Sequence, residues 1–509
     1  SRNIMPNSTL GRLSINLNVS SQLSEKLKVS GKVNYVRQEG FNRPNLTLSP
    51  DNPINALVQM PRNIRLDDLR DFRNPNGSPR LWTNATGNDT WNNPYWAVNL
   101  NTNEDQRDRV IGFVMAEYQF NDRVKMHLRS GTDFYHDERL NRNATGTIYR
   151  VTPDKSFYST FRGRVEETNT DFLMTVNQPI SEDLKVNATL GANRLEIRTR
   201  ALSNVAQGLN IPDFFVIQNA LDVQSSESIS RKEIHSVYAS TQFDWKDQLF
   251  VEVSARNDWS SALPADNRSY FYPALSTSWI FSSLAEEERI GPLTYGKLRA
   301  SVAQVGNDTG PHQLDLLYSV NTLAHGGQTF GQIIPSQPPL DLQPELTTSF
   351  EVGFDMEFFY NRMSLDFTYY NAGTENQILR VPVSRPSGFA TSVVNAGLIR
   401  NEGVEIAFKA TPVLTKDFRY ETYINFTRNR SQVEELAPNV ELYQLGGTYD
   451  QFGVRILAEV GRPFGDIYAD RSFLRDEETG QVVIGRNGLP LPDPEGRKRI
   501  GNFQPDWLA

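Results

Sequence analysis

Alternation of apolar and polar residues at every second position limits most strongly what this chain can fold into. The chain contains no run of the roughly 20 apolar residues that a membrane-spanning helix needs. Its apolar residues instead recur with a period of two, the pattern of β-strands with one apolar and one polar face. The first such segment sets four apolar residues against three polar ones: Leu13, Ile15, Leu17 and Val19 against Ser14, Asn16 and Asn18.

The alternating segments follow one another as hairpins around short polar turns. In the clearest pair, residues 350–358 and 363–369 both alternate and are separated by a turn at 360–362. We predict the other short turns at residues 121–123, 181–183, 246–248 and 414–416. Tight turns between alternating segments predict antiparallel neighbours and an all-β fold.

The length of the strands and of their connections separates a membrane protein from a soluble one. We predict about fourteen strands, several longer than the five or six residues usual in soluble proteins. Tilted transmembrane strands need about 9–11 residues. Long polar segments alternate with the short turns, at residues 39–107, 138–167, 201–231, 305–342 and 380–399. This pattern predicts an antiparallel transmembrane β-barrel of the outer membrane, with long extracellular loops. A soluble sandwich also alternates but explains the long strands poorly.

Composition excludes several classes of function. The 509 residues include no cysteine and carry a net charge of −8, with no basic block that would indicate nucleic-acid binding. The five histidines lack metal-ligand spacing, and no nucleophile elbow is present. We therefore expect no catalytic residue, no metal site and no cofactor. Asp476, Glu477 and Glu478 offer oxygen ligands for calcium but lack EF-hand spacing, so a solvated loop is the favoured interpretation.

Several long motifs occur in order along the chain. The most specific is LQPELTTSFEVGFDMEFFYNRMSLDFTYYN at residues 342–371, followed by NQIL at 376–379 and NAGLIRNEGVEI at 395–406. Further motifs are NPYW at 93–96, RNDWSSALPADNRSYFYPALSTSWIFS at 256–282, LRASVAQVGN at 298–307 and IGNFQPDW at 500–507. Together they resemble the SusC/RagA family of TonB-dependent outer-membrane transporters of Bacteroidetes.

The resemblance implies a mechanism and partners. Members of that family form barrels of about 22 strands with a plugged lumen. A segment near the mature N-terminus binds TonB, a SusD-like surface lipoprotein covers the extracellular mouth as a lid, and barrel–lid pairs commonly dimerise. Together they import oligosaccharides or peptides. By this resemblance the chain is the barrel subunit of such an importer and is not an enzyme.

The sequence departs from the family pattern at both ends. No plug and no TonB-binding segment precede Leu10, and about fourteen strands fall short of about 22. We expect residues 1–509 to form one partial barrel domain, with the plug and the last strands outside this chain. An incomplete wall would leave unpaired strand edges in lipid, so this piece alone should not transport.

Two sets of residues are candidates for contact with a ligand. The first lines the predicted lumen and comprises Lys185, Asn187, Glu351, Asp355, Asp366 and Glu405. The second lies in the first long loop and comprises Trp82, Trp91, Tyr95 and Trp96, which could stack on sugar rings. For Tyr95 and Trp96, within the NPYW motif, anchoring of the loop or contact with the lid is the favoured interpretation. Two other functions remain open: a passive outer-membrane pore, and an adhesive or structural surface barrel.

Overall fold

The computed structural model describes most of the chain. The described residues are 5–45, 49, 51–82, 91–148, 150, 152, 154–285, 290–321, 330–339, 341–445, 453–469, 472–476, 478–494, 496 and 498–502.

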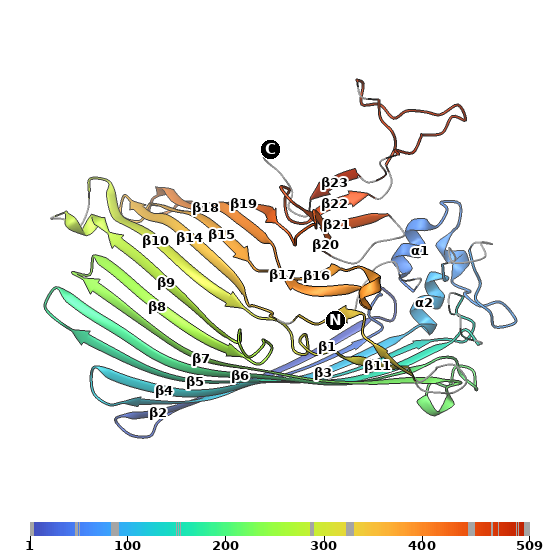
Figure 1. Ribbon diagram of the computed structural model, residues 1–509, viewed down its shortest axis with the longest axis horizontal. Helices are drawn as coiled ribbons and strands as arrows, with labels where there is room; N and C mark the ends of the chain where they lie inside the picture. The colour runs from blue at the N-terminus through green and yellow to red at the C-terminus, as the bar shows by residue number, and fades with distance from the viewer. Residues whose placement is uncertain are drawn as a thin grey trace. The chain divides into compact units, whose positions relative to one another are not determined.

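Fourteen long strands form one antiparallel sheet, in the order β1-β2-β3-β4-β5-β6-β7-β8-β9-β10-β14-β15-β18-β19 (Figure 1). The order follows the chain, as expected when consecutive strands are hairpins. The strands are β1 (Thr9–Gln22), β2 (Leu27–Phe41), β3 (Asn103–Gln119), β4 (Val124–Asn143), β5 (Phe157–Pro179), β6 (Leu184–Ala206), β7 (Val223–Trp245), β8 (Leu249–Ser260), β9 (Ser269–Ile280), β10 (Leu293–Asn307), β14 (Glu345–Phe358), β15 (Met363–Glu375), β18 (Leu398–Leu414) and β19 (Arg419–Glu435).

The connections alternate between the two ends of the sheet, because neighbouring strands are antiparallel. All five predicted short turns are confirmed: each lies between two strands, β3–β4, β5–β6, β7–β8, β14–β15 and β18–β19. The connection between β9 and β10 includes a short helical turn, η3 (Phe281–Leu284). The longer connections therefore lie at the other end (Figure 1).

The predicted bounds of three long loops were wrong, because the strands run further than their apolar residues do. The loop predicted at 138–167 covers only residues 144–156, since β4 ends at Asn143 and β5 begins at Phe157. The loop predicted at 201–231 likewise shrinks to 207–222. The first loop covers 42–102 instead of 39–107. As a result β5, β6 and β7 have 23 residues each, about twice what a tilted transmembrane strand needs.

The long loops carry short elements of their own. The first contains α1 (Pro53–Gln59), η1 (Leu66–Leu69) and α2 (Pro94–Leu100), and the loop before β7 contains η2 (Ile217–Asn219). The next loops form a hairpin of β11 (Tyr318–Asn321) and β12 (Phe330–Ile333), and a sheet of β13 (Ser336–Gln337), β17 (Thr391–Asn395) and β16 (Ile378–Pro382), with η5 (Arg385–Ser387). The segment after β19 forms a four-stranded sheet of β20 (Leu442–Gln444), β21 (Val454–Glu459), β22 (Asp466–Ala469) and β23 (Lys498–Asn502).

The chain divides into two compact units. Unit 1 comprises residues 1–120, 125–172 and 193–233, and unit 2 comprises residues 121–124, 173–192 and 234–509. None of the helices in the described part of the chain has the length and apolarity that crossing a membrane requires.

Each unit has one apolar and one polar sheet face, as the alternation predicts. Directly paired residues form apolar rows across the strands: Ile15, Tyr35, Val110 and Phe134 in unit 1, and Leu249, Trp279, Leu298, Phe354, Phe367, Ile406 and Phe426 in unit 2. We call the face that bears these rows the apolar face and the opposite one the polar face.

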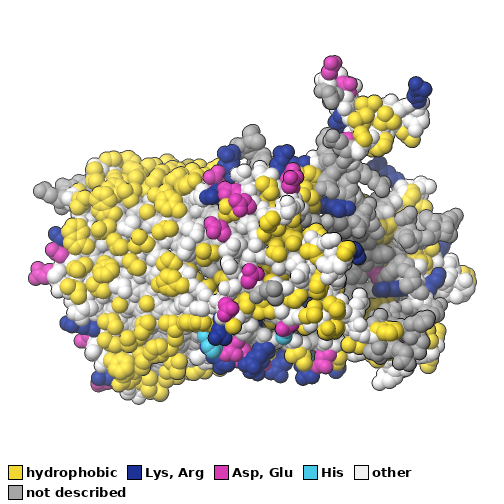
Figure 2. Space-filling view, in the orientation of Figure 1, with side chains coloured by type: hydrophobic (Ala, Val, Ile, Leu, Met, Phe, Trp, Pro, Cys, Tyr) yellow, Lys and Arg dark blue, Asp and Glu magenta, His cyan; other side chains and the backbone are white. Residues whose placement is uncertain are grey.

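In the described part of the chain, protein does not cover the apolar face. On β3 and β8, for example, Val114 and Val253 are 64% and 49% exposed. A soluble sandwich would bury such a face, whereas a lipid-facing wall exposes it. Figure 2 shows hydrophobic side chains gathered toward the end with the short turns. The small protein cores lie under the loops instead, as where Tyr158, Ala206 and Leu209 pack together in unit 1.

Candidate functional site: the polar face and the first long loop

The six predicted wall residues all lie on the polar face of unit 2. Five paired residues define this face across as many strands: Gln242, Glu252, Ser276, Ser301 and Glu351. On β6, Asn187 donates from Nδ2 to Oε1 of Gln242 at 3.5 Å, and Lys185 is two residues away on the same side. Asp355 shares the face with Glu351 and lies opposite Asp366, and Glu405 lies opposite Thr368.

A four-residue ionic cluster forms the centre of this face; we call it the polar-face cluster. Arg299 on β10 pairs with Asp355 on β14, and its Nη2 lies 2.8 Å from Oδ1 of Asp366 on β15. Lys297 completes the cluster, with Nζ 2.6 Å from Oδ2 of Asp355. The two carboxylates lie opposite each other and would repel, so the arginine between them neutralises the pair and joins three strands.

Two hollows flank the polar-face cluster. One of about 260 Å³ is lined by Glu252, Ser276, Arg299 and Glu351 among others. The second, of about 390 Å³, has walls that include Asp355, Asp366, Lys409 and Tyr423. The charged, hydroxyl and aromatic groups that line the two hollows suit the hydroxyl groups of sugars and the amide groups of peptides.

Sequence reasoning identified the acids of this cluster but missed its cations. Lys297 and Arg299 alternate with Leu298 on β10, and this period-two signal could have placed them on the polar face. Their contact with Asp355 and Asp366 depends on the pairing of β10 with β14 and of β14 with β15. That pairing joins residues that are far apart in the sequence, so local patterns do not reveal it.

The first long loop, in unit 1, is organised around the buried carboxylate of Asp51. This side chain is 6% exposed and accepts hydrogen bonds from three amides. The donors are Nδ2 of Asn92 at 3.0 Å, of Asn101 at 2.6 Å and of Asn143 at 2.8 Å. Asn92 and Asn101 flank α2, and Asn143 ends β4, so Asp51 ties the loop to the sheet. Sequence reasoning did not single out this residue.

Of the four aromatic residues predicted in this loop, two are buried. Trp96 is 1% exposed and donates from Nε1 to Oγ1 of Thr147 at 3.2 Å, and Trp91 is 8% exposed. Tyr95 and Trp82 are half-buried, and Nε1 of Trp82 has no partner among the described residues. The burial of Trp96 fits the anchoring interpretation, and Trp82 is better exposed for a ligand than Trp91.

The described residues contain no group of three or more acidic or histidine side chains that could hold a metal ion. Of the acidic run once considered for calcium, Glu477 lies outside the described residues. Oδ1 of Asp476 accepts hydrogen bonds from the backbone N–H and hydroxyl of Thr479, at 2.9 and 2.7 Å. These bonds stabilise the carboxylate and lower the pKa of Asp476.

Comparison with known proteins agrees with this architecture. The chain is 24% identical over 434 residues to TonB-dependent receptor P26 of Formosa agariphila, which covers 82% of this chain and 42% of the relative. It is 21% identical over 465 residues to TonB-dependent receptor SusC of Bacteroides thetaiotaomicron, covering 81% of this chain and 44% of the relative. The chain thus spans less than half the length of these relatives.

Solved structures show the same fold. The RagAB peptide transporter superposes with a TM-score of 0.76 at 19% identity, over 97% of this chain and 54% of that one. The ferripyoverdine receptor of Pseudomonas aeruginosa superposes with a TM-score of 0.52 at 9% identity, over 97% of this chain and 58% of that one. The family described as TonB dependent receptor-like, beta-barrel matches residues 21–482. The chain therefore belongs to this family of outer-membrane receptors and transporters, which are not enzymes.

Proposed function

We propose that this chain is the barrel wall of a TonB-dependent importer that takes up oligosaccharides or peptides through the outer membrane with a SusD-like lid lipoprotein. The observation that carries the proposal is the polar face of unit 2. There the long strands present a continuous row of amide, hydroxyl and carboxylate groups behind an apolar face. Such a wall offers hydrogen bonds to a passing ligand and needs no chemistry on it.

The ligand path in this proposal follows the six wall residues. Glu351 and Glu405 offer acceptors to hydroxyl and amide groups, while Lys185 and Asn187 offer donors. Two relatives support the proposal: SusC is a TonB-dependent receptor, and RagAB is a peptide transporter. In this proposal residues 1–509 contribute to a single barrel domain, and TonB supplies the energy for uptake.

Uptake by cells tests this proposal. The gene that encodes the chain is deleted in its own host, and growth is measured on defined oligosaccharides and on defined peptides as sole nutrient. We expect loss of growth on one class, the same loss in a strain without TonB, and co-purification of a surface lipoprotein with the tagged barrel. Uptake that persists without TonB would favour a passive pore. Normal growth with lost attachment would favour an adhesive role.

The aromatic residues of the first loop give a residue-level test. Trp82→Ala should weaken ligand binding by the complete transporter, because a half-buried ring that could stack on a sugar is lost. Trp91→Ala should instead loosen the loop, since Trp91 is 8% exposed. Barrel assembly, followed by heat-modifiable migration in gels, should be normal in both variants. Unchanged affinity of the Trp82→Ala variant would reject a stacking role.

A further inference from the structure

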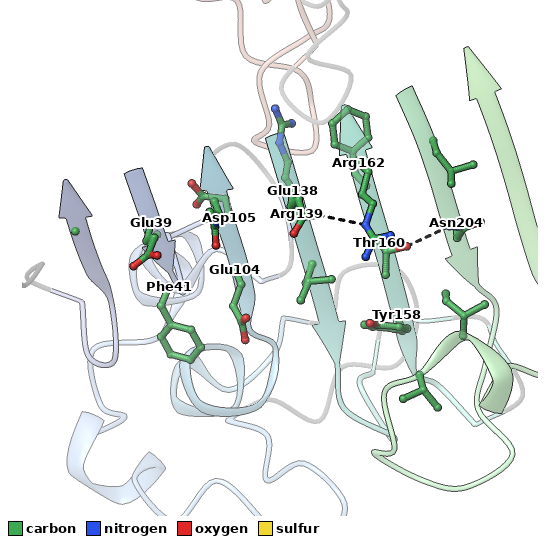
Figure 3. Close-up of a pocket in the computed structure, with 18 of the residues that line it drawn as sticks. Glu39, Phe41, Glu104, Asp105, Glu138, Arg139, Tyr158, Thr160, Arg162 and Asn204 are labelled. Atoms are coloured by element: carbon green, nitrogen blue, oxygen red, sulfur yellow. Dashed lines mark hydrogen bonds and ion pairs between the residues drawn. The ribbon is translucent and has the colours of Figure 1, made fainter. Parts of the chain in front are cut away.

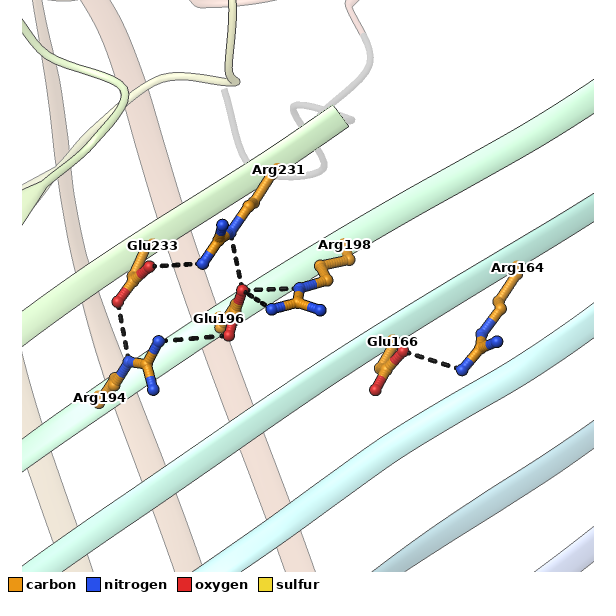
Figure 4. Close-up of polar contacts among 7 residues, drawn as sticks. All are labelled: Arg164, Glu166, Arg194, Glu196, Arg198, Arg231 and Glu233. Carbon is orange, nitrogen blue, oxygen red and sulfur yellow. Dashed lines mark hydrogen bonds and ion pairs between the residues drawn. The ribbon is translucent and has the colours of Figure 1, made fainter. Parts of the chain in front are cut away.

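Above its apolar residues, the apolar face of β6 becomes strongly charged. Even-numbered positions of β6 carry Leu184, Val186, Ala188 and Leu190 first, and then Arg194, Glu196, Arg198 and Arg200. Because alternate residues of a strand share a face, the charged row continues the apolar one toward the long loops. Neighbouring strands repeat the change, with Arg164 and Glu166 on β5 and with Arg231 and Glu233 on β7 (Figure 4).

One contact within unit 1 places this charged row on the apolar face. The guanidinium of Arg164 lies over the ring of Phe134, 5.2 Å from its centroid. Phe134 belongs to the apolar row with Val110 and Tyr35. The charged residues are therefore on the side of the sheet that meets lipid, directly beyond the apolar band.

Five of these residues form a compact group that we call the arginine cluster: Arg194, Glu196, Arg198, Arg231 and Glu233. The carboxylate of Glu196 pairs with all three arginines, with distances of 3.4 Å to Arg194, 2.6 Å to Arg198 and 2.7 Å to Arg231. Glu233 pairs with Arg194 at 2.8 Å and with Arg231 at 3.2 Å (Figure 4).

The acids of this cluster are half-buried, and its bases are exposed. The side chain of Glu196 is 12% exposed, whereas those of the three arginines around it are 54–56% exposed. The contacts in the described part of the chain use Nε and Nη2 of the arginines, so Nη1 of each remains for an outside group. Guanidinium groups with free donors bind phosphate well.

The distance that the charged row extends beyond the apolar residues indicates a lipid with a large headgroup. Arg194 and Arg200 follow Leu190 by four and ten residues, which is about 13 and 33 Å along a strand at about 3.3 Å per residue. The headgroup layer of a phospholipid bilayer is only about 5–8 Å thick on each side. A lipid whose headgroup is built from phosphorylated sugars would reach the whole row.

A groove on the same unit lies next to this row. It has a volume of about 1110 Å³, and its lining includes Phe41, Glu104, Glu138, Thr160 and Arg162 (Figure 3). Arg162 and Arg164 share one side of β5, and Arg162 pairs with Glu138 at 3.3 Å. Carboxylates, hydroxyls and an aromatic ring suit the sugar part of a headgroup.

We propose that the arginine cluster binds the phosphate groups of a sugar-based lipid headgroup in the outer leaflet, with the groove receiving its sugars. This goes beyond the proposed import function and rests only on the outer-membrane location. The cluster would fix the lipid around β5, β6 and β7, where the strands extend furthest beyond the apolar band. Lipid binding by the arginine cluster does not depend on nutrient uptake. A negative result in the lipid-binding test would therefore leave the importer proposal intact.

The test uses the complete transporter in nanodiscs of a zwitterionic lipid, with diphosphoryl lipid A and its dephosphorylated form as probes. We expect the triple variant Arg194→Gln, Arg198→Gln, Arg231→Gln to bind diphosphoryl lipid A at least about tenfold more weakly, because three charged hydrogen-bond donors are lost. The dephosphorylated probe should bind weakly to both proteins. Equal binding of the two probes, or unchanged binding by the triple variant, would overturn the proposal.

Glu196→Gln gives a prediction of opposite sign. It frees the donors of three arginines, so binding of diphosphoryl lipid A should become several-fold tighter. Glu421→Gln, which removes an acid paired with Arg419 near the short turn of β18 and β19, makes the same change in charge and should have no effect. Equal gains in both variants would mean general attraction and reject the site. Cross-links from position 198 to a second copy, without bound lipid, would assign the face to a protein contact.

Discussion

Two ionic clusters in this molecule differ in their balance of charge. In unit 2, the polar-face cluster sets Lys297 and Arg299 against Asp355 and Asp366, so charges balance. In unit 1, the arginine cluster sets three arginines against Glu196 and Glu233, so one positive charge is in excess. The first cluster leaves its cations 28–31% exposed, and the second leaves its cations 54–56% exposed.

The charge balance of each cluster fits the surroundings of its face. A wall that passes a ligand must not hold it, and paired charges reduce the net field along the polar face. An arginine group next to an apolar face meets headgroups, where exposed cations find anions outside the protein. Balance therefore suits the polar face, and an excess of donors suits the rim of the apolar face.

Asp51 extends this comparison to a buried carboxylate whose three amide partners are neutral. Asp51→Ala should cost about 2–4 kcal/mol of local stability, because it leaves the amides of Asn92, Asn101 and Asn143 without their acceptor. The measurement is limited proteolysis of the first long loop in the complete protein. Asp71→Ala in the same loop removes a carboxylate that is 78% exposed and serves as the control. Equal cleavage of both variants would contradict the role of Asp51.

Arg299→Leu tests the balanced cluster directly. The loss of the guanidinium leaves Asp355 and Asp366 facing each other, and we expect the barrel to lose about 1–2 kcal/mol, since these groups are only partly buried. Denaturant unfolding of the complete protein in detergent measures the change. Arg419→Leu, at an exposed pair with Glu421, is the matched control. A loss of the same size in both variants would remove the special role of Arg299.

Glu196→Gln should behave differently from Arg299→Leu in the same unfolding experiment. Its partners are exposed arginines that water can solvate, so we expect no change in the unfolding midpoint beyond measurement error. A shift as large as that of Arg299→Leu would contradict this expectation. It would mean that the arginine cluster holds strands together rather than offering donors outward.

The smallest effect is expected at Asp476, a surface carboxylate with neutral partners. Hydrogen bonds from Thr479 lower its pKa in the folded protein, so their stabilising contribution is present above the ordinary aspartate pKa of about 3.9 and disappears as the pH falls through the lowered value. Thr479→Ala should raise the pH at which this stabilisation of the loop is lost. Digestion by an acid protease, compared between the two proteins at each pH from 2 to 5, measures it. Identical profiles would contradict the assignment.

Much of the fold could be predicted from local patterns. The period-two alternation predicted the two faces of the sheet and the number of strands, and clusters of polar residues predicted the short turns. Both signals are encoded within a few residues. The loop bounds failed where charged residues continue a strand. Within the loop predicted at 138–167, Arg162, Arg164 and Glu166 alternate with Phe161, Gly163 and Val165 on β5, because a strand that extends above the membrane can carry charged residues on its lipid side.

The candidate site was predictable only in part. The wall residues could be assigned to one face because face follows from parity along a strand. The partners of Asp355 could not be predicted, because they depend on the register between β10 and β14. The three amides around Asp51 come from positions up to 92 residues away, and no spacing rule connects them.

Local alternation therefore predicts the class of structure, a membrane sheet with short turns at one end and long loops at the other. Which charges meet depends on the folded chain: Arg299 lies between two aspartates, Asp51 among three amides, and Glu196 beneath three arginines. The physical reason is that alternation is a property of one strand, whereas register is a property of pairs of strands. A shift of one residue between β10 and β14 would exchange the faces and separate Arg299 from Asp355 and Asp366.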